Sequence, residues 1–121
     1  QTSITTDASD TAIGGQLEQK QHGRWVPIAF FSRKLSAAEK NYSTFDRELL
    51  AAFCAIKHFR HFVEGRQFTL FTDHKPLVMA LRSSAERLSP RQTRHMSLIA
   101  EFTSDVQHVQ GKFNVVADAL S

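Results

Sequence analysis

The chain has 121 residues, 41% of them hydrophobic and 22% charged, which is typical of one globular domain and excludes a disordered or collagen-like chain. It holds no apolar run approaching the ~18 residues of a membrane span and no secretory signal pattern, so we expect no membrane association. Its single cysteine, Cys54, cannot form an internal disulfide, and no Cys/His cluster has the spacing of a zinc site.

The net charge of +3 comes from 15 Lys and Arg against 12 Asp and Glu, a balance that favours a polyanionic partner such as nucleic acid. Part of the excess lies between Arg82 and His95, where four arginines accompany one acid, Glu86. A solvated helix face often has the same composition. Charge by itself therefore leaves both interpretations open.

Three strands are predicted at the start of the chain, because β-branched and aromatic residues alternate there between turn residues. They cover residues 3–7, 12–19 and 25–32. Their short connections, the second of them His22-Gly23, predict an antiparallel meander. Pro27 predicts an edge position or a bulge for the third strand, and Gly14-Gly15 in the second allows another backbone to approach closely.

Helices are predicted next, from two capping signals. Residues 36–39 (SAAE) fit a capping box that opens a short helical turn, and residues 43–46 (STFD) open a long helix that continues to about Phe62. Apolar residues recur along the long helix at steps of three and four, which predicts one stripe facing a sheet. This stripe consists of Tyr42, Phe45, Leu49, Ala52, Ile56 and Phe59.

The rest of the chain alternates between strands and helices. The predicted elements are a strand at 67–73, a short helix at 76–81, a helix from Ser89-Pro90 to about Phe102, a strand at 105–109 and a final helix from Asn114. The order βββαβαβα with one inserted helix predicts an α/β fold with a five-stranded mixed sheet. Its first three strands are antiparallel, its last two are parallel, and helices cover both faces. This is an RNase H-like architecture.

Four carboxylates fall where this topology would bring them together: Asp7, Glu48, Asp73 and Asp118. The first and fourth strands would be parallel neighbours, so Asp7 and Asp73 would lie side by side. Carboxylates that close repel one another unless a cation lies between them. Small residues after Glu48 would let the long helix approach the sheet and bring this third carboxylate near.

Clustered carboxylate oxygens suit Mg²⁺ or Mn²⁺, and such ions in pairs promote phosphodiester hydrolysis. Setting the four acids aside leaves 8 of the 12 acidic residues against 15 basic ones, so nucleic acid becomes the favoured partner. A single acid at a strand end or in a first helical turn is more often a turn former or a helix-dipole partner. We interpret Asp10, Glu39 and Asp46 in that way.

The chain resembles the RNase H domain of reverse transcriptases from gypsy-type LTR retrotransposons. The segments that carry the resemblance are TDAS (6–9), FSRKL (31–35), AEKNYST (38–44), RELLA (47–51), TDHKPL (72–77) and ADALS (117–121). The resemblance implies that Asp7, Glu48, Asp73 and Asp118 are catalytic metal ligands for two Mg²⁺ ions, with Mn²⁺ as a substitute. It also implies a metal-dependent endoribonuclease that cleaves the RNA strand of RNA/DNA hybrids during reverse transcription.

Five further residues are candidates for contacts with the hybrid: Ser9, Arg33, His74, Lys112 and Asn114. Ser9 and His74 flank two of the proposed ligands, although an imidazole at such a position can also be a surface group without a role. Arg33 and Lys112 are candidate phosphate contacts, although long cationic side chains on loops are usually just solvated. Cellular and retroviral relatives carry a histidine in the loop before the last helix, whereas residues 110–113 here are QGKF.

The resemblance further implies that residues 1–121 are one domain of a longer polyprotein, between a polymerase domain and an integrase region. Its expected location is the cytoplasm, in virus-like particles. One alternative is a catalytically silent RNase H-like connection or a domesticated nucleic-acid-binding module, against which the four acids argue. Another is a different nuclease of the same fold, against which the TDH and ADALS segments argue.

Overall fold

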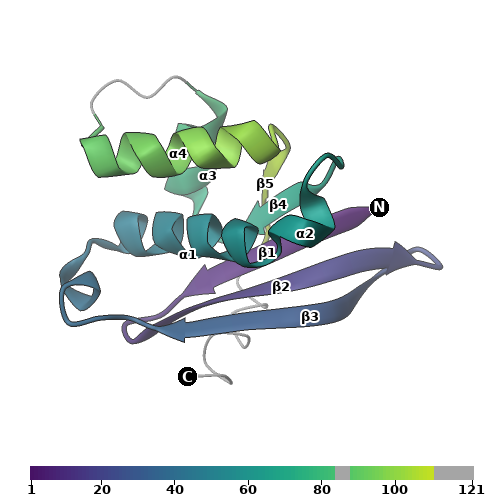
Figure 1. Ribbon diagram of the computed structural model, residues 1–121, viewed down its shortest axis with the longest axis horizontal. Helices are drawn as coiled ribbons and strands as arrows, with labels where there is room; N and C mark the ends of the chain where they lie inside the picture. The colour runs from purple at the N-terminus through teal and green to yellow at the C-terminus, as the bar shows by residue number, and fades with distance from the viewer. Residues whose placement is uncertain (84–87, 111–121) are drawn as a thin grey trace.

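The computed structural model describes residues 1–83 and 88–110. Its sheet contains β1 (Thr2–Ala8), β2 (Ala12–Gln21), β3 (Arg24–Lys34), β4 (Thr69–Thr72) and β5 (Val106–His108), in the order β3-β2-β1-β4-β5 (Figure 1). Strands β1, β2 and β3 pair antiparallel, whereas β4 pairs parallel with both β1 and β5. The predicted mixed sheet is confirmed.

The second hairpin turn, between β2 and β3, and the strand β3 itself follow the sequence closely. His22 and Gly23 both adopt positive φ, 53° and 77°, which is the backbone of a two-residue turn that matches the twist of the flanking strands. Strand β3 lies at the edge of the sheet, and its register with β2 shifts between Leu17 and Glu18, opposite Pro27. Pro27 therefore lies on an edge strand and next to a bulge, as expected. Such positions tolerate proline because it has no N–H to donate to a neighbouring strand.

The helices begin at their predicted caps. The short turn η1 (Glu39–Asn41) follows the Ser36 capping box; α1 (Thr44–His58) is capped by Ser43, and α4 (Pro90–Phe102) by Ser89. Two further helices are α2 (Arg60–Val63) and α3 (Lys75–Arg82). None of the helices in residues 1–83 and 88–110 is long and apolar enough to cross a membrane.

The long helix ends earlier than predicted. The apolar pattern favours a helix to Phe62, but α1 ends at His58, and Phe59 leaves the α-helical backbone at φ −95° and ψ 15°. The Phe59 ring is only 1% exposed, and α2 starts at the next residue. Tertiary burial of this ring therefore accompanies a break that local periodicity does not show.

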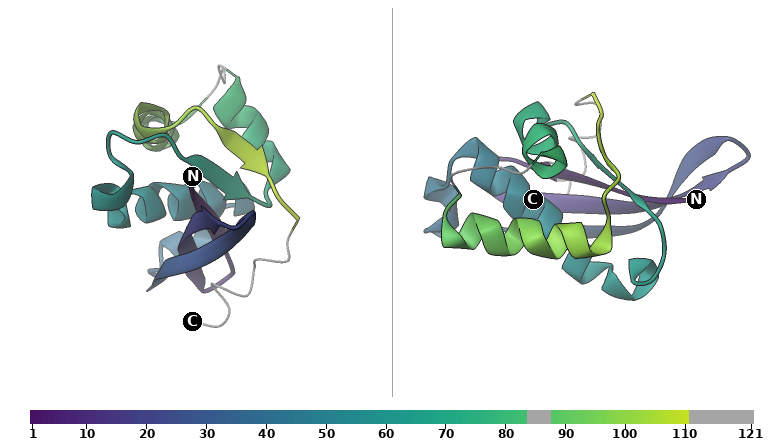
Figure 2. Two further views of the ribbon diagram at one scale, coloured as in Figure 1. Left: turned by 90° about the vertical axis from the view of Figure 1, so that its right-hand side faces the viewer. Right: turned by 90° about the horizontal axis from the view of Figure 1, so that it is seen from above.

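Helix α1 lies across β1 and β2, and α4 packs along α1, while α3 contacts β4 and β5 (Figures 1 and 2). The main core joins Ile4, Leu17 and Leu70 of the sheet to Leu49 and Ile56 of α1. The predicted apolar stripe thus faces the sheet. The final helix expected from Asn114, which would cover the other face, lies outside the described residues.

Gly15 allows α1 to lie close to the sheet. A Cβ atom on Gly15 would stand 2.8 Å from the Cβ of Ala55, closer than two carbon atoms can pack. Ala51, Ala52 and Ala55 are all fully buried. The close approach predicted from the paired glycines is confirmed at Gly15.

We expect Gly15→Ala to lower the free energy of unfolding by about 1–3 kcal/mol, because the added methyl group must push α1 away from β2. Urea unfolding followed by circular dichroism measures the change. Gly23→Asn is the control, since Asn tolerates the positive φ and a Cβ there meets nothing within 4 Å. A Gly15→Ala protein as stable as the parent would mean that the approach is not tight in solution.

Candidate metal centre

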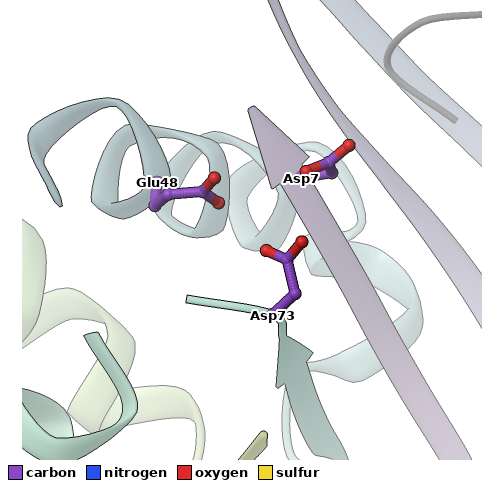
Figure 3. A group of neighbouring side chains, drawn as sticks. All are labelled: Asp7, Glu48 and Asp73. Atoms are coloured by element: carbon purple, nitrogen blue, oxygen red, sulfur yellow. The ribbon is translucent and has the colours of Figure 1, made fainter. Parts of the chain in front are cut away.

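Three of the four predicted carboxylates converge in the structure. Asp7 lies near the end of β1, Asp73 directly follows β4, and Glu48 lies near the start of α1; one carboxylate oxygen from each lies within 4.8 Å of the others. Figure 3 shows the three side chains directed toward a common space. Asp7 and Glu48 are buried and Asp73 is half-buried. The fourth predicted carboxylate, Asp118, lies outside the described residues.

The parallel pairing of β1 and β4 positions the two aspartates. Thr6 pairs with Thr72, so Asp7 and Asp73, the next residue of each chain segment, emerge together at the same edge of the sheet. On the other side of β1, Asp7 pairs with Gly14 of β2, a residue without a side chain. Two neighbouring strands therefore bring the like charges of Asp7 and Asp73 together.

Helix α1 supplies the third carboxylate from a protected position. Glu48 is 5% exposed, and its Oε1 has no hydrogen-bond partner among the described residues. Burial raises the pKa of Glu48 to about 8, repulsion from Asp7 and Asp73 adds to this, and the Ala8 N–H and Arg47 act in the opposite direction. A buried carboxylate beside two others is costly unless a proton or a cation compensates it.

The donor set fits a hard divalent cation. All three groups offer carboxylate oxygens, which Mg²⁺ and Mn²⁺ prefer over nitrogen or sulfur ligands. The Glu48 carboxylate that carries the orphaned oxygen points toward the same cluster. A cation bound here would offset the repulsion that the fold imposes, so the residues present fit a metal site.

His74 lies next to the cluster, at the cap of α3. Its ring packs edge to face against Phe45, with 6.1 Å between ring centroids. Partial burial lowers the pKa of His74, and the Asp73 charge acts against this. A mostly neutral imidazole beside Asp73 can donate or accept a hydrogen bond at neutral pH, and its contact with substrate stays a prediction.

Two other candidate substrate contacts have structural partners. Ser9 Oγ accepts the N–H of Ala12 at 3.1 Å and shapes the turn after Asp7. The Arg33 guanidinium makes two hydrogen bonds to Glu39, at 3.0 and 3.1 Å, and a third to Cys54 Sγ at 3.6 Å. These bonds tie the end of β3 to η1 and α1. Lys112 and Asn114 lie outside the described residues.

The three acids interpreted as turn formers or helix-dipole partners, Asp10, Glu39 and Asp46, are not members of the cluster. Each has a cationic neighbour: Asp10 has Arg47 at 3.6 Å, Glu39 has Arg33 at 3.0 Å, and Asp46 has Arg91 at 3.3 Å. None of the three belongs to the carboxylate group found among residues 1–83 and 88–110, and their roles as turn formers or helix-dipole partners stay a prediction. Arg47, which was not among the candidate residues, also donates to the Tyr42 carbonyl at 2.9 Å. Its position directly before Glu48 is the feature of the sequence that could have indicated a role.

Comparisons with known proteins agree with this geometry. Residues 1–102 match the family model described as the RNase H-like domain found in reverse transcriptase. The Retrovirus-related Pol polyprotein from transposon 412 of Drosophila melanogaster is 42% identical over 118 residues, which cover 98% of this chain. The chain spans only 9% of the length of that polyprotein.

Two solved structures share the fold. RNase H1 from the archaeon Halobacterium salinarum superposes with a TM-score of 0.75 at 18% identity, covering 98% of this chain and 92% of the other. LC11-RNase H1, solved in complex with an RNA/DNA hybrid, also gives 0.75, at 15% identity, with 99% and 93% covered. The predicted RNase H-like fold is confirmed.

Proposed function

The chain belongs to the family of RNase H-like domains found in reverse transcriptases, and on this premise we propose that it is a metal-dependent endoribonuclease. Its proposed substrate is the RNA strand of RNA/DNA hybrids formed during reverse transcription of a retroelement. The observation that carries the proposal is the convergence of Asp7, Glu48 and Asp73 within 4.8 Å. Family membership supports the hybrid as substrate.

Asp7, Glu48 and Asp73, together with Asp118, are the residues that would hold two Mg²⁺ ions, or Mn²⁺ in their place. When bound, such ions supply Lewis-acid charge to a phosphodiester and lower the pKa of a coordinated water. The protein's own contribution is positional. Asp7 lies in β1, Asp73 directly follows the neighbouring β4, and Glu48 lies in a helix packed on the sheet, so the oxygens are held within or directly next to regular elements.

The environment of the cluster also suits a charged substrate. Asp7 and Glu48 are at most 5% exposed, which limits competition from bulk water around these two ligands. Outside the four proposed ligands the chain is basic, with 15 Lys and Arg, and so attracts a polyanion. The proposed partners within the polyprotein are a polymerase domain and an integrase region, and the proposed location is cytoplasmic virus-like particles.

Cleavage of a hybrid with a labelled RNA strand tests the proposal. The assay uses high protein concentration, low salt and either Mg²⁺ or Mn²⁺, with single-stranded RNA, duplex RNA and chelator as controls. We expect metal-dependent cutting of the RNA in the hybrid alone. Absence of cutting in both metals, with the protein shown by circular dichroism to be folded, would overturn the proposal for this chain and favour a silent connection or binding module.

A further inference from the structure

The first turn of α4 holds the first turn of α1 through one carboxylate. Asp46 Oδ2 accepts from Arg91 Nη2 at 3.3 Å, and Asp46 Oδ1 accepts from Gln92 Nε2 at 2.7 Å. Asp46 lies two residues before Glu48 in the same helical turn. Both carboxylate oxygens are thus bound by residues more than forty positions away in the chain, and the start of α1 is fixed against α4.

Arg91 also contacts the residue that precedes the helix. Its guanidinium carbon lies 4.2 Å from the centroid of the Tyr42 ring, within the range of a cation–π contact. Tyr42 and Asp46 lie on either side of Ser43, whose side chain caps α1. The Arg91 guanidinium therefore contacts the residue before the Ser43 cap and a residue in the first turn after it. It can stack on the ring because it is planar, which a lysine ammonium group is not.

The α4 side of this contact is itself rigid. Gln92 Oε1 accepts the N–H of Ser89 at 2.9 Å, and Ser89 Oγ accepts the N–H of Gln92 at 3.1 Å. The Gln92 amide thus closes the capping box of α4 with its oxygen and binds Asp46 with its nitrogen. Because Gln92 and Arg91 are adjacent, the same box orients the Arg91 backbone.

The start of α1 needs such support because Glu48 faces two like charges. The carboxylates of Asp7, Glu48 and Asp73 converge within 4.8 Å and repel one another when ionised, which pushes the helical turn that carries Glu48 away from the sheet. First turns of helices fray easily, since their N–H groups lack intrahelical partners. A contact that ties this turn to α4 opposes that displacement before any cation is bound.

We propose that Arg91 is a positioning residue for the metal centre, which holds Tyr42 and Asp46 and thereby keeps the Glu48 carboxylate beside Asp7 and Asp73. This inference rests on the proposed function, because it concerns the same metal centre. Arg91 itself does not touch the reacting atoms. Its effect is on the affinity of the cluster for the cation.

Arg91→Ala compared with Arg94→Ala tests the inference. Arg94 lies one turn further along α4 and is exposed, and no hydrogen bond or ion pair joins it to α1 within residues 1–83 and 88–110. Both variants lose one positive charge, which by Coulomb attraction alone would strengthen Mg²⁺ binding. The positioning role predicts the opposite sign for Arg91→Ala only.

The main readout is calorimetric titration of the protein with Mg²⁺ in the absence of nucleic acid. We expect about tenfold weaker binding for Arg91→Ala, as for losses of groups that orient metal ligands, and no weakening for Arg94→Ala. In hybrid cleavage, the Mg²⁺ concentration for half-maximal rate should rise by the same factor while kcat at saturating Mg²⁺ stays within about twofold. Arg91→Lys should restore only part of the affinity, since it keeps the charge and loses the planar stack.

Asp46→Asn provides a second, independent variant should Arg91→Ala fold poorly. Because Asp46→Asn also loses a negative charge, it is compared with Asp10→Asn, which loses the same charge at an exposed side chain. Asp46→Asn should weaken Mg²⁺ binding by a larger factor than Asp10→Asn does. Equal Mg²⁺ affinities in Arg91→Ala and Arg94→Ala would overturn the inference. If the parent protein binds Mg²⁺ with this dependence on Arg91 but cuts no hybrid, the proposed function fails and the positioning role stands.

Discussion

Asp73→Asn is expected to abolish cleavage of the RNA/DNA hybrid while leaving the fold intact. Asparagine has nearly the same size and keeps one oxygen, so the end of β4 can retain its structure. It removes the charge of one of three converging carboxylates, and a lost metal ligand costs several kcal/mol of transition-state stabilisation. We expect kcat to fall by a factor of about 10³ or more.

The measurement is the rate of cutting of hybrid labelled on its RNA strand, at saturating Mg²⁺. Asp10→Asn is the matched control, because Asp10 follows the same strand as Asp7 but its side chain is 95% exposed; its rate should stay within about twofold of the parent. Unchanged far-ultraviolet circular dichroism shows that the fold is retained. Full activity in Asp73→Asn would remove Asp73 from the site.

Glu48→Gln is expected to stabilise the metal-free protein and to eliminate its stabilisation by Mg²⁺. The buried Glu48 carboxylate is repelled by Asp7 and Asp73, and glutamine keeps its shape without its charge. In the parent, Mg²⁺ should raise Tm by mass action, because the folded protein presents the cluster and the unfolded chain does not. In the variant that increase should be small.

The pH dependence gives the sign of this effect. The pKa of Glu48 is raised to about 8 in the folded protein, above its ordinary value of about 4.5, so between these values the folded state holds a proton that the unfolded chain releases. The stability of the metal-free parent therefore gains from Glu48 protonation at low pH and falls as pH rises from about 4.5 to 8. Because glutamine does not titrate, the free energy of unfolding of Glu48→Gln should lack this fall between pH 4.5 and 8.

Urea unfolding in chelator at pH 5, 6.5 and 8 measures the free energy of unfolding of the parent and of Glu48→Gln. The stability advantage of Glu48→Gln over the parent should be largest at pH 8. Glu39→Gln is a control of opposite sign. The Arg33 guanidinium lowers the pKa of Glu39, so its contribution is present above the ordinary value and disappears as pH falls, and Glu39→Gln should destabilise the protein at pH 8. A difference between Glu48→Gln and the parent that does not change with pH would contradict the crowding of the carboxylates.

The sequence by itself determined the strands, the helix caps and the pairing of Asp7 with Asp73. These depend on local chemistry: alternation of side chains, turn residues such as Gly23, capping hydroxyls, and the rule that successive strand–helix–strand units pair in parallel. Glu48 could be added because the alanines after it allow close packing. For Asp118, Lys112 and Asn114, outside the described residues, the sequence remains the sole basis of prediction.

Only the tertiary structure decided the contacts between distant segments. It ended α1 at His58 so that Phe59 could be buried, paired Arg33 with Glu39, and joined Arg91 to Asp46 and Tyr42. Such contacts depend on how two helices or a loop and a strand pack, which no local periodicity encodes. The placement of the carboxylates follows from strand order, whereas the side chains that hold them there depend on packing between residues far apart in the chain.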